Sequence, residues 1–147
     1  MPKANERIGP YQFIRILGEG GLGEVWLAQE FSGSNSREVV VKMPLKSEID
    51  LNSLLQEATP WTRVPGHANV LEFLAARVFD GQIVLVSEYA PDGSLKDWLG
   101  QHGGRAPSVE AALEMTLGIL AGLEHLHKRS VIHRDVRPDN VLLLRAT

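Results

Sequence analysis

The chain has 147 residues, of which 44% are hydrophobic and 22% are charged, and it contains no cysteine. This composition is ordinary for one soluble globular domain, and it excludes disulfides, zinc–thiolate sites and cysteine nucleophiles. The net charge of −3 argues against nucleic acid as a main partner, because duplex binding requires a basic face.

No targeting or membrane segment is predicted. Residues 1–7 are polar and no apolar core follows them, so they do not resemble a signal peptide. The longest apolar runs, such as residues 141–144, are far too short to span a bilayer. We therefore expect a cytoplasmic domain without membrane contact, and the oligomeric state stays open.

The first ninety residues predict about five strands. Residues 11–17 and 24–29 flank a glycine cluster and are expected to form a hairpin. A loop is expected over residues 31–36, which contain serine, glycine and asparagine. The β-branched run over residues 37–43 suits a buried strand. Residues 71–89 predict a second hairpin, because two apolar runs are joined there by Asp-Gly.

One helix is predicted between the third and fourth strands. Leucine and alanine recur at helical spacing over residues 48–64. Pro60 lies inside this stretch and should kink or end the helix near Thr59.

The rest of the chain predicts helices. A short helix is expected over residues 95–99, and Ser108 is a plausible N-cap for a helix over residues 109–128. A polar loop follows, and residues 141–144 predict a final short strand. The long helix carries an apolar stripe at a period close to 3.6 residues: Val109, Leu113, Leu117, Leu120 and Leu123 or Leu126.

A glycine-rich motif joins the two strands of the first hairpin. Residues 18–25 read G-E-G-G-L-G-E-V and fit the pattern G-x-G-x-x-G-x-V. Glycines of this kind let backbone N–H groups approach phosphate oxygens. A dinucleotide-binding fold uses similar letters, but its loop opens a helix, whereas this one leads into a strand-like run. A plain glycine-rich turn without a ligand stays open on this motif alone.

Lys42 ends the run V-V-V-K, which matches the pattern V-A-I-K with Val40 in the alanine position. A buried lysine is costly unless an anion pairs with it. Glu57, on the predicted helix, is a reasonable partner, and such a pair would leave the ammonium aimed at phosphates. A solvated strand end is the competing interpretation of Lys42.

The most specific motif is H-R-D-V-R-P-D-N over residues 133–140, which matches H-R-D-L-x-x-x-N with valine for leucine. An aspartate fixed in such a loop, here Asp135, can accept a hydroxyl proton. An asparagine five residues later, here Asn140, can bind a metal ion.

These three motifs, in this order, resemble the eukaryotic-type (Hanks-type) serine/threonine protein kinase family from about residue 8 to residue 144. The resemblance implies an α+β, protein-kinase-like fold. Residues 1–90 would form a five-stranded antiparallel N-lobe sheet with one helix, called αC in the family. Residues 91–147 would form the first helices of the C-lobe. The implied reaction transfers a phosphoryl group from ATP to a serine or threonine hydroxyl of a protein substrate, with Mg²⁺.

The resemblance also implies roles for individual residues. Lys42 would contact the α- and β-phosphates while Glu57 holds it, Asp135 would be the catalytic base, and Asn140 would bind Mg²⁺. Arg137 stands where the family usually has lysine, and it keeps the charge in a bulkier, forked group. The residues implied around the nucleotide are Leu17, Gly18, Glu19, Gly20, Gly21, Leu22, Gly23, Val25, Val40, Glu88, Ala90 and Leu142, with Ser87 as a small gatekeeper.

Two features depart from the family pattern. Pro60 lies three residues after Glu57 and shortens the helix that must carry it, which leaves Glu48 as the other candidate acid. No D-F-G or A-P-E follows Asn140 within the 147 residues, so the metal site has Asn140 alone. We therefore expect a kinase by family whose 147 residues are themselves inactive. The alternative is a catalytically inactive, pseudokinase-like nucleotide-binding module that acts through protein contact.

Overall fold

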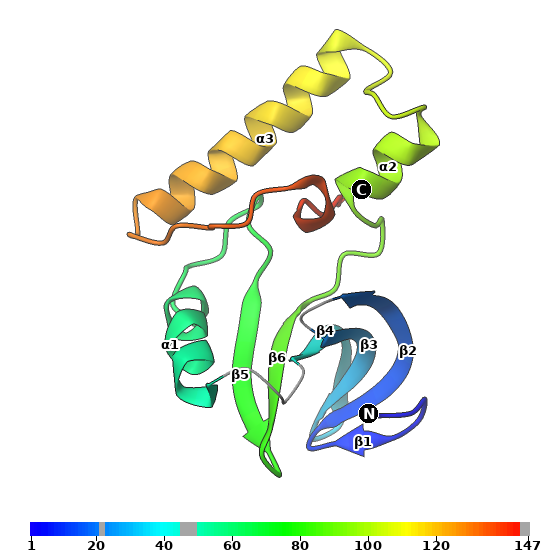
Figure 1. Cartoon of the computed structure of the whole chain (residues 1–147), viewed down its shortest axis with the longest axis vertical. Helices are drawn as coiled ribbons and strands as arrows, with labels where there is room; N and C mark the ends of the chain where they lie inside the picture. The colour runs from blue at the N-terminus through cyan, green and yellow to red at the C-terminus, as the bar shows by residue number, and fades with distance from the viewer. Residues whose placement is uncertain (21–22, 45–49, 145–147) are drawn as a thin grey trace. The chain divides into compact units, whose positions relative to one another are not determined.

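The computed structural model describes residues 1–20, 23–44 and 50–144. The side chains of Leu51 and Glu57 lie outside this description. The chain divides into two compact units (Figure 1). The first consists of Met1–Arg63 and Glu72–Tyr89, and the second of Val64–Leu71 and Ala90–Thr147.

The first unit contains an antiparallel sheet whose described strands follow the order β1-β2-β3-β4-β6-β5. There are six of these strands, where the sequence predicted five. The additional strand β1 is only two residues long, so no alternating pattern could reveal it. The strands are β1 (Arg7–Ile8), β2 (Tyr11–Gly20), β3 (Gly23–Ser32), β4 (Asn35–Pro44), β5 (Phe73–Phe79) and β6 (Gln82–Glu88).

Both predicted hairpins are present. β2 pairs with β3 across the glycine motif, and β5 pairs with β6 across Asp80 and Gly81, which both have positive φ angles, 48° and 75°. The loop expected over residues 31–36 is wrong, because Ser32 pairs with Asn35 and only two residues turn the chain. Gly33 supplies the left-handed backbone, with φ 61°, that so tight a turn requires.

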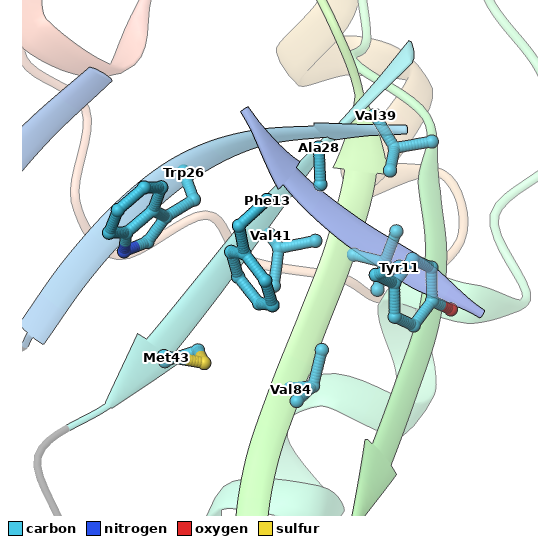
Figure 2. Packing of buried hydrophobic residues seen from close by; sticks show 9 residues of the cluster. Tyr11, Phe13, Trp26, Ala28, Val39, Val41, Met43 and Val84 are labelled. Carbon is cyan, nitrogen blue, oxygen red and sulfur yellow. The ribbon is translucent and has the colours of Figure 1, made fainter. Parts of the chain in front are cut away.

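The core of the first unit lies on one face of the sheet (Figure 2). Alternate residues of the central strands are fully buried, including Val39 and Val41 on β4. The rings of Phe13 and Trp26 pack edge to face with centroids 5.5 Å apart. This alternation leaves the intervening residues of β4 for the opposite face of the sheet.

Helix α1 (Leu51–Thr62) packs against β5 and begins at Asp50, whose carboxylate accepts the Asn52 N–H at 3.2 Å. The sequence predicts that Pro60 kinks or ends this helix near Thr59, and the helix does not end there. Pro60 lies inside the helix, which continues to Thr62 and is capped by Arg63. Proline removes one hydrogen bond, but the Thr62 hydroxyl and the Arg63 N–H still bond to carbonyls of this last turn.

The second unit contains α2 (Leu95–Gln101), α3 (Val109–His127) and the short 3₁₀ helix η1 (Pro138–Asn140). Ser108 caps α3 as predicted, by accepting the Ala111 N–H at 3.1 Å. The stripe on α3 is split: Leu126 is buried, whereas Val109, Leu113, Leu117 and Leu120 are more than half exposed. No helix in the described ranges is long and apolar enough to cross a membrane.

The C-terminal end of α3 closes with a Schellman motif. The Ser130 N–H donates to the His127 carbonyl and the Val131 N–H donates to the Leu126 carbonyl, both at 3.0 Å. Ser130 has φ 58°, the left-handed conformation that this motif usually assigns to glycine. Leu126 and Val131 are both buried, so an apolar pair accompanies the motif.

The strand expected over residues 141–144 is wrong. This segment forms only an isolated antiparallel bridge with the residues that precede α2, so its backbone has too few partners to make a strand. The bridge pairs Ser94 with Leu142 and is flanked by hydrogen bonds from Leu95 N–H to Val141 O, 2.7 Å, and from Leu143 N–H to Gly93 O, 2.9 Å.

Candidate nucleotide-binding and catalytic site

The glycine motif lies at the closed end of the β2–β3 hairpin. Glu19 pairs with Glu24 and Gly20 pairs with Gly23, while residues 21–22 between them lie outside the described part of the chain. The predicted contributions of Gly21 and Leu22 are therefore untested.

The glycines of this motif differ in what the fold requires of them. Gly23 has φ 127°, and a Cβ there would lie 2.0 Å from the Met43 carbonyl oxygen on β4, so this glycine is needed by the sheet itself. A Cβ on Gly18 would meet no atom of the described residues within 4 Å. The fold does not demand glycine at position 18, and the open space beside it is compatible with a ligand. Leu17, at the β-bulge just before it, is 37% exposed.

Cross-strand pairing places predicted site residues on the sheet face opposite the core. Val25 on β3 pairs with Lys42 on β4, and Val40 pairs with Ser87 on β6. Side chains alternate along a strand, so Val40 and Lys42 lie on the face opposite Val39 and Val41. Val25, Val40 and Lys42, all predicted to contact the nucleotide, thus share one face of the first unit.

Lys42 is half-buried on this face. No ion pair joins its ammonium to any side chain that the structure describes. Glu57 lies on α1, but its side chain is not described, so its pairing with Lys42 stays a prediction. Glu48, the other candidate acid, belongs to residues 45–49 outside the described ranges.

The chain around Glu88 and Ala90, which the kinase resemblance places beside the nucleotide, is tied to its neighbours by polar contacts. The Glu88 N–H donates to the Glu72 carbonyl at 3.0 Å, and the Glu88 carboxylate accepts the Glu72 N–H at 2.8 Å. Arg15 on β2 donates to the Tyr89 hydroxyl at 3.3 Å. Ala90, the first residue of this stretch in the second unit, is 7% exposed. These contacts hold the backbone in place, while the adenine contacts of Glu88 and Ala90 remain predictions.

The second unit brings together the three polar residues predicted for catalysis. The Asn140 side-chain amide donates to the Asp135 carbonyl oxygen and to Asp135 Oδ2, both at 2.9 Å. Arg137 Nε lies 3.5 Å from Asp135 Oδ1 on the other side of the carboxylate. Arg134 adopts φ 68°, a strained conformation for a side chain of its size. The Asp135 side chain is 59% exposed, so a substrate hydroxyl can reach it.

Sequence reasoning missed two charged residues at this site, Asp139 within the loop and Lys96 on α2. Asp139 Oδ2 lies 3.9 Å from Arg137 Nη2 and 4.0 Å from Lys96 Nζ, which reaches it from α2. Such exposed pairs contribute little stability individually, but they restrict where the guanidinium lies. Asp139 could have been noticed as the acid inside the motif. Lys96, 43 positions earlier by number, carries no sequence signal.

The first turn of α2 is held by its own capping box beside this loop. The Ser94 backbone N–H and hydroxyl donate to the Asp97 carboxylate at 3.1 and 2.9 Å, and together they lower the pKa of Asp97. Ser94 also pairs with Leu142, which is 37% exposed. Leu142, predicted to lie beside the nucleotide, is thus paired with the capped start of α2, and its contact with the nucleotide remains a prediction.

Comparison with known proteins identifies the family. The family model described as "Protein tyrosine and serine/threonine kinase" matches residues 11–147. The chain belongs to this protein kinase family.

This chain matches only a part of each of its longer relatives. "Serine/threonine-protein kinase C" of Synechocystis is 34% identical over 144 residues, covering 92% of this chain and 26% of the relative. "Serine/threonine-protein kinase PknA" of Nostoc is 31% identical over 148 residues, covering 90% and 25%. The PknI kinase domain of Mycobacterium tuberculosis has the same fold, with a TM-score of 0.82 at 23% identity, covering 98% of this chain and 58% of that domain. The chain therefore spans about a quarter of these two curated relatives.

Proposed function

We propose that these residues are the ATP-binding and catalytic-loop part of a serine/threonine protein kinase acting on a protein substrate. The observation that carries the proposal is the Asp135 carboxylate held between the Asn140 amide and the Arg137 guanidinium. A carboxylate oriented in this way is suited to accept a proton from a substrate hydroxyl.

Asn140 would serve two purposes through its two ends. Its Nδ2 is committed to Asp135, so Oδ1 is the atom that would bind Mg²⁺. When bound, Mg²⁺·ATP supplies the phosphoryl group and the metal neutralises charge on the phosphates. Arg137 would keep a positive charge beside the reacting groups.

The first unit fits a nucleotide by its own geometry. Lys42 is a half-buried cation for which the described side chains supply no anion, and this is costly unless an anionic ligand compensates. Val25 and Val40 provide an apolar surface beside it, and Gly18 leaves open space before β3. These residues are compatible with a base and a phosphate chain on one face.

Preference for serine or threonine rests on two observations. The relatives named above are serine/threonine-protein kinases, and Arg137 and Pro138 supply the basic residue and proline of that subclass in the catalytic loop. Tyrosine kinases usually have a different loop without this proline. The identity of the substrate stays open.

Binding of Mg²⁺·ATP to the 147-residue chain, measured by isothermal titration calorimetry, tests the proposal. Lys42→Met should weaken binding at least about tenfold, because a charge-assisted contact is worth about 1.5–3 kcal/mol. Lys128→Met is the matched control, since Lys128 pairs with Glu124 on α3 at 2.6 Å and should change affinity less than about twofold. Equal effects of the two substitutions would contradict the proposal.

Phosphoryl transfer tests whether the 147 residues are themselves active. The 147 residues contain no D-F-G after Asn140, so we expect no transfer from them alone, because one metal ligand does not hold the metal that the reaction needs. Turnover on a generic protein substrate that Asp135→Asn abolishes would contradict this expectation. Specific capture of a protein partner by a chain that binds ATP but transfers no phosphoryl group would favour the alternative.

A further inference from the structure

Two histidines join the segment Val64–Leu71 to α3 within the second unit. The rings of His67 and His125 stack with centroids 4.5 Å apart and planes tilted by 35°. His125 Nε2 lies 2.9 Å from the Pro65 carbonyl oxygen, so the segment also contacts α3 through its backbone. Neither histidine belongs to the proposed catalytic site.

The partners of His125 define its protonation state. A carbonyl oxygen only accepts, so Nε2 must carry the proton that points at Pro65. Arg129 Nη1 lies 3.0 Å from His125 Nδ1, and a guanidinium only donates, so Nδ1 must present its lone pair. These two contacts are compatible only with a neutral ring. A second proton, on Nδ1, would point at the Arg129 guanidinium and would give the ring a positive charge like that of the guanidinium.

His67 is constrained in the same way. Its Nδ1 accepts the Asn69 backbone N–H at 3.0 Å, which closes a tight turn at residues 67–70. A proton on Nδ1 would remove this acceptor and place a second positive ring against His125. Both rings must therefore be neutral for the observed hydrogen bonds to form together.

The backbone of the segment Val64–Leu71 also lies close to α3. A Cβ on Gly122 would lie 2.3 Å from the Asn69 carbonyl oxygen, and a Cβ on Gly118 would lie 3.1 Å from Asn69 Nδ2. Gly122 is buried on α3. Because Val64–Leu71 packs this closely on α3, it cannot rearrange its hydrogen bonds without moving away from the helix. Loss of a histidine acceptor should therefore detach the segment from α3.

We propose that the His67–His125 pair is a proton-sensitive contact that holds Val64–Leu71 on α3 only while both rings are neutral. Among the described residues, the charged group in contact with the pair is Arg129, whose Nη1 faces His125 Nδ1, while Glu124 on α3 is engaged by Lys128. Histidine ordinarily gains its second proton near pH 6.5, so the contact should weaken on mild acidification. The segment connects α1 to β5 in the sequence, and its release would give that connection a pH-dependent mobility.

Residue-resolved hydrogen exchange of the 147-residue chain tests this proposal. The protection factor of the Asn69 amide should fall about fivefold or more between pH 7.5 and pH 5.5, because a typical hydrogen bond corresponds to about a fivefold change in the opening equilibrium. Protection that is absent at pH 7.5, or unchanged at pH 5.5, would overturn the proposal.

Variants separate the two histidines from general acid effects. In His67→Asn/His125→Gln, the Asn side-chain oxygen can still accept the Asn69 N–H and the Gln amide can still donate to Pro65, but neither titrates. This variant should keep the protection at both pH values. His127→Gln, on the same helix, should retain the wild-type fall. Should the double variant not fold, the single variant His67→Asn, which keeps an acceptor for the Asn69 N–H but cannot titrate, should reduce the fall. An unchanged fall in the double variant or in His67→Asn would refute the mechanism.

Discussion

Single replacements of Gly18, Gly23 and Gly33 by alanine test which of these glycines the fold requires. Gly23 should be required by the sheet, whereas Gly18 should be replaceable without loss of stability. At Gly23, alanine must adopt φ 127° and place Cβ 2.0 Å from a carbonyl oxygen. Backbone strain of this kind costs about 1–3 kcal/mol, and overpacking adds about 1–3 kcal/mol. The free energy of unfolding should therefore fall by about 2–6 kcal/mol.

The other two positions calibrate this value. Gly33 has φ 61° but nothing within 4 Å of a built Cβ, so alanine there should cost only the left-handed conformation, about 1–2 kcal/mol. Gly18 has neither a positive φ nor a close neighbour, so Gly18→Ala should be neutral or stabilise by up to about 1 kcal/mol. If Gly18 serves the nucleotide, the same variant should weaken Mg²⁺·ATP binding without loss of stability.

Urea unfolding followed by tryptophan fluorescence provides the assay. In a Trp61→Phe/Trp98→Phe background the signal comes from Trp26, which is 5% exposed in the core of the first unit. The order of destabilisation should be Gly23, then Gly33, then Gly18. A Gly23→Ala variant within about 0.5 kcal/mol of Gly33→Ala, well below the strain and overpacking costs, would refute the steric argument.

Three further predictions concern the second unit. Ser130→Gly should raise its free energy of unfolding by about 1 kcal/mol, because glycine removes the cost of a left-handed residue in the Schellman motif; lower stability in urea unfolding would contradict this. The lowered pKa of Asp97, caused by its bonds to Ser94, means that the capping box stabilises α2 above the ordinary pKa of 3.8 and loses this effect as the pH falls through the lowered value. Hydrogen exchange of α2 should show that loss in the wild type but not in Asp97→Asn. Leu113→Gln/Leu117→Gln should reduce self-association in sedimentation velocity at little cost in stability, since both side chains are 57% exposed; a wild type that is monomeric at all concentrations would contradict this.

Local patterns in the sequence predicted much of the fold correctly. Asp80-Gly81 specifies a hairpin by its tolerance of positive φ, and Ser108 specifies a helix start by its hydroxyl acceptor. Such features act within a few residues, so they can be recognised without the fold. Of the two effects predicted for Pro60, the end of the helix near Thr59 did not occur. Propensity describes an average cost, whereas hydrogen bonds in the last turn of α1 and packing against β5 support this helix.

Residues of the site could be predicted from the sequence only where they belong to a recognisable motif. Asp135 and Asn140 were predicted from their spacing, and the structure shows them hydrogen-bonded. Lys96 could not be found, because its approach to Asp139 depends on how α2 lies beside η1. The different roles of Gly18 and Gly23 could not be predicted either. Both positions are glycine in the sequence, and only the approach of β4 to Gly23 in the fold distinguishes them.

The two β-bulges of β2 determine where related proteins can lose a residue from this strand without a change in its pairing. The register shifts between Phe13 and Arg15 and again between Ile16 and Gly18, so Ile14 and Leu17 are the extra residues. Deletion of either one would regularise the strand and leave Gly18 opposite Val25. Removal of Arg15 or Ile16 would instead take a paired residue out of the ladder. Related sequences of different length should therefore have their alignment gaps at positions 14 and 17, with the glycine loop still anchored to the same residues of β3.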